Sequence, residues 1–127
     1  MKTKQILGNG LYNALQEDNK VLAVILFGSL ARNEPHRDVD ICLVLDKKYD
    51  NLVMSKMRLN YTAFAKKNID MHVFQQLPLY VQQRVLNEGK IILCKDEDVL
   101  YETAFATIKE MNFYKKVYEN YLVAVEA

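Results

Sequence analysis

Two short apolar runs in the first third of the chain enclose a polar segment, and this pattern predicts two buried β-strands. The runs are Val21–Phe27 and Val39–Leu45, and both are rich in β-branched and other large apolar residues. Each is bounded by charged residues or glycine, as short buried strands usually are. Successive side chains of a strand point to opposite faces, so we expect Asp38 and Asp40 to share one face at the start of the second strand.

Apolar residues spaced three or four positions apart predict helices on either side of these strands. The expected helices cover residues 3 to 17, 50 to about 67, 78 to 89 and 96 to about 123, with Asp50 and Asp96 as N-caps, Pro78 at a first position and Gly89 at an end. Two more apolar runs, residues 68 to 74 and 90 to 95, predict further strands. This order predicts an α/β fold with a small mixed sheet. Helices are expected on one face of the sheet, and Asp38, Asp40 and Asp70 are expected to be exposed on the other.

The last predicted helix carries tyrosines at helical spacing near its end, namely Tyr114, Tyr118 and Tyr121. The simpler interpretation is that this aromatic surface packs on its own domain. The alternative is a partner or dimer surface, because tyrosine is enriched at protein interfaces.

Composition bounds the classes of function. The chain has 127 residues, 50% of them hydrophobic, which suffices for the core of one domain spanning residues 1–127. A net charge of +1 and the lack of a basic cluster argue against action on long nucleic acids. Cys42 and Cys94 lie in strand-like runs and are expected as core residues. With no signal peptide and no transmembrane run, we expect a cytoplasmic protein that does not associate with membranes.

Candidate chemistry is concentrated between the first two predicted strands. Two neighbouring carboxylates, Asp38 and Asp40, repel each other unless a proton or a cation lies between them, and a hard divalent ion such as magnesium suits oxygen ligands. Gly28 and Ser29 directly follow the first strand, where a glycine lets backbone N–H groups approach a phosphate closely. Arg32 can add positive charge. The sequence therefore predicts a phosphate site and a metal site facing one cleft.

These residues resemble the core motif of the DNA polymerase beta-type nucleotidyltransferases. Gly28-Ser29-Leu30-Ala31-Arg32 followed by Asp38-Val39-Asp40 is similar to the pattern of their minimal (MNT) branch, in which many members are antitoxins paired with a HEPN-domain toxin. Two departures from the family pattern are Asn33 in place of its second glycine and a shorter spacer, with Arg37 in place of a serine.

The resemblance implies a nucleotidyltransferase fold and a set of roles. Asp38, Asp40 and Asp70, the last on the third predicted strand, would be catalytic and would bind two magnesium ions. Gly28, Ser29 and Arg32 would bind the phosphates of ATP. His72 is expected as a hydrogen-bonded neighbour, because hard cations prefer oxygen.

The resemblance also implies a reaction and a partner. The protein would transfer AMP from magnesium-ATP to a hydroxyl, with a tyrosine of a cognate HEPN toxin as the expected acceptor, in a homo- or hetero-oligomer. Two alternatives stay open: a catalytically degenerate module that neutralises a toxin by binding it, and a nucleotidyltransferase that acts on small molecules.

Overall fold

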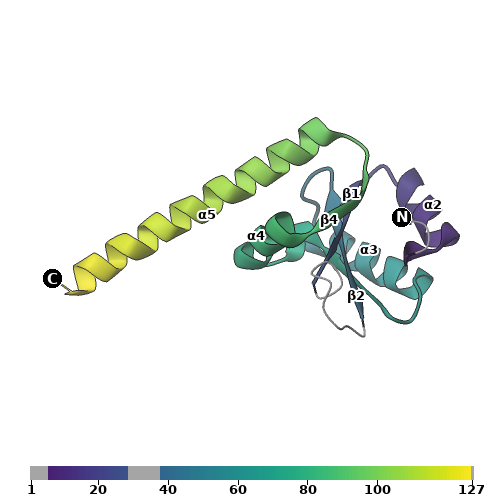
Figure 1. The fold of residues 1–127 in the computed structure, drawn as a ribbon, viewed down its shortest axis with the longest axis horizontal. Helices are drawn as coiled ribbons and strands as arrows, with labels where there is room; N and C mark the ends of the chain where they lie inside the picture. Colours follow the sequence, from purple (N-terminus) through teal and green to yellow (C-terminus); the bar gives the residue numbers. More distant parts are fainter. Residues whose placement is uncertain (1–5, 29–37, 127) are drawn as a thin grey trace.

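A four-stranded mixed sheet forms the centre of the protein (Figure 1). The computed structural model describes residues 6–28 and 38–126. The strands are β1 (Val21–Phe27), β2 (Val39–Leu45), β3 (Ile69–Val73) and β4 (Lys90–Cys94), in the spatial order β3-β2-β1-β4. β1 pairs antiparallel with β2 and β4, whereas β2 and β3 are parallel. The predicted α/β fold class and mixed sheet are confirmed.

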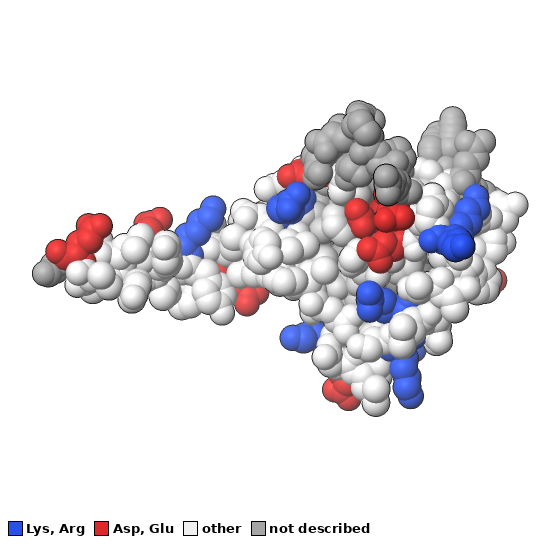
Figure 2. Space-filling model, turned by 90° about the horizontal axis from the view of Figure 1, so that it is seen from below, with Lys and Arg blue, Asp and Glu red and all other residues white. Residues whose placement is uncertain are grey.

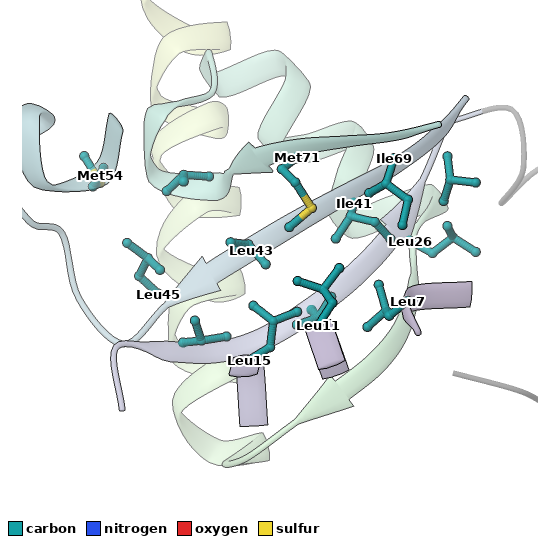
Figure 3. Close-up of a cluster of buried hydrophobic side chains, with 14 residues drawn as sticks. Leu7, Leu11, Leu15, Leu26, Ile41, Leu43, Leu45, Met54, Ile69 and Met71 are labelled. Atoms are coloured by element: carbon teal, nitrogen blue, oxygen red, sulfur yellow. The ribbon is translucent and has the colours of Figure 1, made fainter. Parts of the chain in front are cut away.

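The first face of the sheet is covered by helices α2 (Asn9–Glu17) and α3 (Asn51–Phe64). A large hydrophobic cluster lies between these helices and the sheet (Figure 3). From the strands it takes alternate residues of β2, as the period of two requires, and from the helices it takes Leu11, Leu15 and Met54. The predicted division of β2 into two faces is therefore correct.

The second face carries a smaller hydrophobic cluster, formed where α4 (Leu79–Glu88) and the start of α5 (Glu97–Glu126) pack on the sheet. Val85 of α4 and Leu100 of α5 join Ile25, Cys42 and Val44 in it. The prediction of helices on one face only was wrong in this respect. β1 and β2 are apolar and buried on both faces over most of their length, so both faces of the sheet need covering helices. On this second face the polar residues Asp40 of β2 and Asp70 and His72 of β3 lie next to one another.

Element ends differ from the predictions by a few residues. The first predicted helix is interrupted at Gly8, whose φ of 85° lies outside the helical region, and its residues 3 to 5 fall outside the described part. Pro78 is the N-cap of α4 and not its first residue. Asp96 caps α5 as predicted, since its Oδ1 accepts hydrogen bonds from the backbone N–H groups of Asp98 and Val99. Asp50 precedes α3 but its side chain makes no capping hydrogen bond.

Helix α5 has 30 residues, and its second half projects away from the sheet (Figure 1). Tyr114, Tyr118 and Tyr121 are each more than half exposed. The interpretation that these tyrosines pack on their own domain was therefore wrong, and the alternative of a partner surface becomes relevant. Within the described ranges, no helix combines the length and the hydropathy that crossing a bilayer requires. Cys42 is buried in the core as predicted, and Cys94 is half-buried.

Candidate functional site

The start of β2 lies between the end of β1 and the start of β3, and this register brings polar residues together. Asp40 is paired with Phe27 of β1 on one side and with Asp70 of β3 on the other. Residues paired across adjacent strands project their side chains to the same face. The carboxylates of Asp40 and Asp70 therefore lie side by side on the second face, beyond the edge of the hydrophobic cluster there.

His72 occupies the space between the two carboxylates. Its Nε2 lies 3.5 Å from Oδ1 of Asp40 and 3.2 Å from Oδ2 of Asp70. This nitrogen is shielded from solvent and has no hydrogen bond of good geometry within the described part of the chain. The two distances are therefore close polar contacts and not hydrogen bonds. The ring of Phe27 meets the His72 ring edge to face, with centroids 5.4 Å apart. Phe27 thus fixes the orientation of the imidazole.

The environment of Asp40 disfavours its negative charge. Burial raises the pKa of the Asp40 carboxyl above its usual value, His72 acts in the opposite direction, and the carboxylates of Asp70 and Asp38 raise the pKa further. The Asp40 side chain is 29% exposed, whereas that of Asp70 is 53% exposed. A cation bound between them would offset both the burial and the mutual repulsion.

Gly28 ends β1 directly above Asp40 and adopts a φ of 82°. Residues with a side chain rarely adopt this backbone conformation, and a Cβ at this position would collide with Oδ2 of Asp40. Glycine therefore allows the chain to leave β1 without displacing the carboxylate. The approach of Gly28 to a phosphate stays a prediction, and the neighbour that the structure shows at Gly28 is the Asp40 carboxylate.

The predicted site residues divide into three groups. Asp40 and Asp70 are brought together as predicted, and His72 lies beside them, but its Nε2 does not make the predicted hydrogen bond to a described residue. Asp38 is exposed and close enough to influence the pKa of Asp40, but its carboxylate lies outside the set of described ligand atoms that are within 4.8 Å of one another. Ser29 and Arg32 lie outside the described residues. The contact of Phe27 with His72 was not predicted, because it depends on the register of β1 and β3 on the two sides of β2, which the sequence pattern does not fix.

The donor set of this site fits a hard divalent cation. One ligand atom each from Asp40, Asp70 and His72 lies within 4.8 Å of the others. Two carboxylates and an imidazole nitrogen that has no hydrogen-bond partner among the described residues are groups that can turn to a shared ion, and carboxylate oxygens are the ligands that magnesium prefers. Figure 2 shows a compact acidic patch, drawn in red, on the globular part of the molecule.

Comparison with known proteins places this geometry in context. The family described as Polymerase beta, Nucleotidyltransferase matches residues 9–98, which include every strand of the sheet. A candidate protein adenylyltransferase of Methanocaldococcus jannaschii is 32% identical over 77 residues, which are 58% of this chain and 57% of that protein. The chain thus spans a little over half the length of this curated relative.

Two similar solved structures contain toxin and antitoxin chains. One is a toxin–antitoxin structure with AMP-PNP, whose matched chain has a TM-score of 0.67 and 22% identity, over 95% of this chain and 100% of that one. The other is the tri-AMPylated HEPN toxin of Shewanella oneidensis in complex with an MNT antitoxin, with a TM-score of 0.62 and 20% identity, over 93% of this chain and 95% of the matched one. These structures share the fold of the chain.

Proposed function

The chain belongs to the polymerase beta nucleotidyltransferase family, and on this premise we propose that it transfers AMP from ATP to a hydroxyl of a partner protein. The observation that carries this proposal is the pairing of Asp40 with Asp70 across parallel strands, which presents two carboxylates at the open end of the second face. We further propose that residues 1–127 form one nucleotidyltransferase unit.

Asp40 and Asp70 would hold magnesium, and Asp38 would complete the carboxylate set by turning toward Asp40. Magnesium, when bound, supplies positive charge that stabilises the attacking and leaving oxygens of a phosphoryl-type transfer. The chain's own contribution is to hold the carboxylates in place. The sheet register fixes Asp40 and Asp70, and His72 Nε2 lies within reach of both oxygens.

The transfer itself needs an acceptor oxygen that loses its proton. Asp70 is the more exposed of the two paired carboxylates, so it can accept that proton as the hydroxyl approaches. The hydroxyl oxygen then forms a bond to the α-phosphorus of ATP, the bond from this phosphorus to the bridging oxygen breaks, and pyrophosphate leaves. Gly28 leaves room for phosphate next to Asp40, and we propose Ser29 and Arg32 as further phosphate contacts.

The proposed acceptor is a tyrosine of a HEPN toxin. The support comes from the Methanocaldococcus jannaschii relative, which is named as a protein adenylyltransferase, and from the Shewanella oneidensis complex, in which the toxin is AMPylated. A covalently attached AMP adds negative charge and bulk to the toxin, which would inhibit binding of an RNA substrate by repulsion and by volume. The protein would thus act as the antitoxin.

A second candidate function is neutralisation by binding alone. The exposed apolar residues of the projecting part of α5 favour it, because they offer a surface for a partner whether or not transfer occurs. The two functions are separated by the covalent state of the partner.

The test is to co-express the chain with its HEPN partner and to measure the intact mass of that partner. AMP-sized increments are expected with the wild-type chain and should be absent with Asp40→Asn and with Asp70→Asn. Asp46→Asn, just after the other end of β2, is the matched control and should give the same increments as the wild-type chain. An unmodified partner in a stable wild-type complex would contradict the enzyme and support the binding module.

Magnesium binding gives a readout that does not depend on the acceptor. At a concentration ten times its dissociation constant, magnesium should stabilise the wild-type chain by about 1.4 kcal/mol, as expected for a ligand that binds only the folded state. Asp40→Asn should lose this gain in a thermal melt, and Asp46→Asn should keep it. An equal gain in all three proteins would remove Asp40 from the metal site.

A further inference from the structure

One apolar repeat runs along nearly the whole of α5. It alternates steps of four and three residues, which is the heptad spacing of a helix that packs against another helix along its length. Its members are Leu100, Ala104, Thr107, Met111, Tyr114, Tyr118, Tyr121 and Val125. We name the last four of these residues the tyrosine stripe.

The repeat is covered at its start and uncovered at its end. Leu100 and Thr107 are buried, and Met111 is half-buried, where α5 passes α4. Exposure then rises to 57% at Tyr114 and 61% at Tyr118. Tyr114 still lines a hollow together with Leu79 and Tyr80 at the start of α4, so the tyrosine stripe continues directly from the α4–α5 contact.

The projecting part of α5 has little reason to be helical by itself. Residues 112 to 126 are all exposed, and a helix of this length, about 22 Å, is marginal in water without packing. Its sequence contains several valines and tyrosines, which favour helices less than alanine or leucine. Stability of this segment as a helix therefore requires contact of the tyrosine stripe with another surface.

The chemistry of the tyrosine stripe favours a different chain over a second copy. In self-pairing, tyrosine rings would meet tyrosine rings at most positions, and none of the four stripe positions carries a small residue that would make room for a facing ring. Tyrosines instead suit a partner that offers small or aliphatic side chains for the rings and oxygen acceptors for the hydroxyls. In the first half of α5, where the helix contacts α4, the repeat carries Leu100, Ala104 and Thr107, of which Leu100 and Thr107 are buried.

We propose that the tyrosine stripe is the docking surface for a helix of the toxin partner, which would extend the α4–α5 contact beyond the domain. This inference rests on the proposed function for the identity of the partner. It assigns the binding of the partner to α5 and the chemistry to the acidic site at the start of β2 and β3, so that binding and transfer depend on separate residues.

The test compares two double variants of the full chain for their affinity to the purified HEPN partner. Tyr118→Ala with Tyr121→Ala removes the centre of the tyrosine stripe and should raise the dissociation constant at least 30-fold. The matched control is Lys116→Ala with Val123→Ala, which removes two exposed side chains of the same segment that lie on the opposite side of α5 from the tyrosine stripe. The control should change the dissociation constant less than 3-fold.

Three results would overturn the inference: equal affinities of the two double variants, a larger effect of the control, or a wild-type homodimer that the Tyr118 and Tyr121 changes dissociate. Hydrogen exchange gives an independent readout, since amides 112 to 126 should exchange quickly in the free chain and slowly in the complex. Asp40→Asn should bind the partner as wild type does. Failure of transfer with intact, stripe-dependent binding would refute the proposed function alone, whereas transfer with stripe-independent binding would refute this inference alone.

Discussion

The two faces of the sheet are built from the same strands but are covered to different extents. On the first face, α2 and α3 cover β1, β2 and β3 from end to end, and every inward residue of β2 is buried. On the second face, α4 and α5 cover the sheet only as far as Cys42, and the start of β2 and β3 is left with Asp40, Asp70 and His72. The comparison shows that the acidic site occupies the part of the sheet that no described helix reaches.

The largest expected effect on stability comes from the fully covered face. Leu43 is wholly buried in the first cluster, and Leu43→Ala should lower the free energy of unfolding by about 2–5 kcal/mol, through lost burial and the cavity left behind. Urea denaturation measures this change. If Asp40→Asn lowered the free energy of unfolding as much as Leu43→Ala, the proposed difference in stability between the two faces would be wrong.

A smaller effect is expected where the strand leaves the sheet above Asp40. Gly28→Ala should lower the free energy of unfolding by about 1–2 kcal/mol, because an alanine at a positive φ has a strained backbone. The added Cβ would also displace the Asp40 carboxylate. Magnesium affinity, measured by the thermal shift, should fall with it. Gly10→Ala in α2 is the control: it sits in a helix beside the exposed ring of Phe64, and it should leave magnesium affinity unchanged. Equal magnesium affinities of Gly28→Ala and Gly10→Ala would show that Gly28 does not contribute to the magnesium site.

The smallest effect is a dependence of stability on pH at the open face. Because the folded pKa of Asp40 is raised above the unfolded value, the folded state binds this proton more tightly, and ionisation of Asp40 costs stability as pH rises through the two values. Asp40→Asn removes that cost. Without magnesium, the melting temperature of Asp40→Asn should equal that of wild type well below pH 3.8, the ordinary pKa of the aspartate side chain, and should exceed it at pH 7. A lower melting temperature at pH 7 would show that the charged form is favoured.

Periodicity predicted the elements well, because a strand or a helix leaves its own spacing in the sequence. It placed Asp40 on the correct face of β2 and located Asp70 on the next strand. It failed for the second face, since contacts such as Val85 with the sheet join residues far apart in sequence. It also failed for Tyr118, because a stripe that packs on its own domain and one that packs on a partner have the same spacing. The contact of Phe27 with His72 likewise depends on strand register, which spacing alone does not fix.

The position of β4 at the edge of the sheet has a consequence for the order in which the strands assemble. Ala23 of β1 pairs with Cys94 of β4, whereas β1, β2 and β3 are complete by residue 73. These three strands can therefore pair with one another before β4 docks, and until then the outer edge of β1 is unpaired. Such an edge can pair with another chain, so slow docking of β4 is expected to increase aggregation during folding.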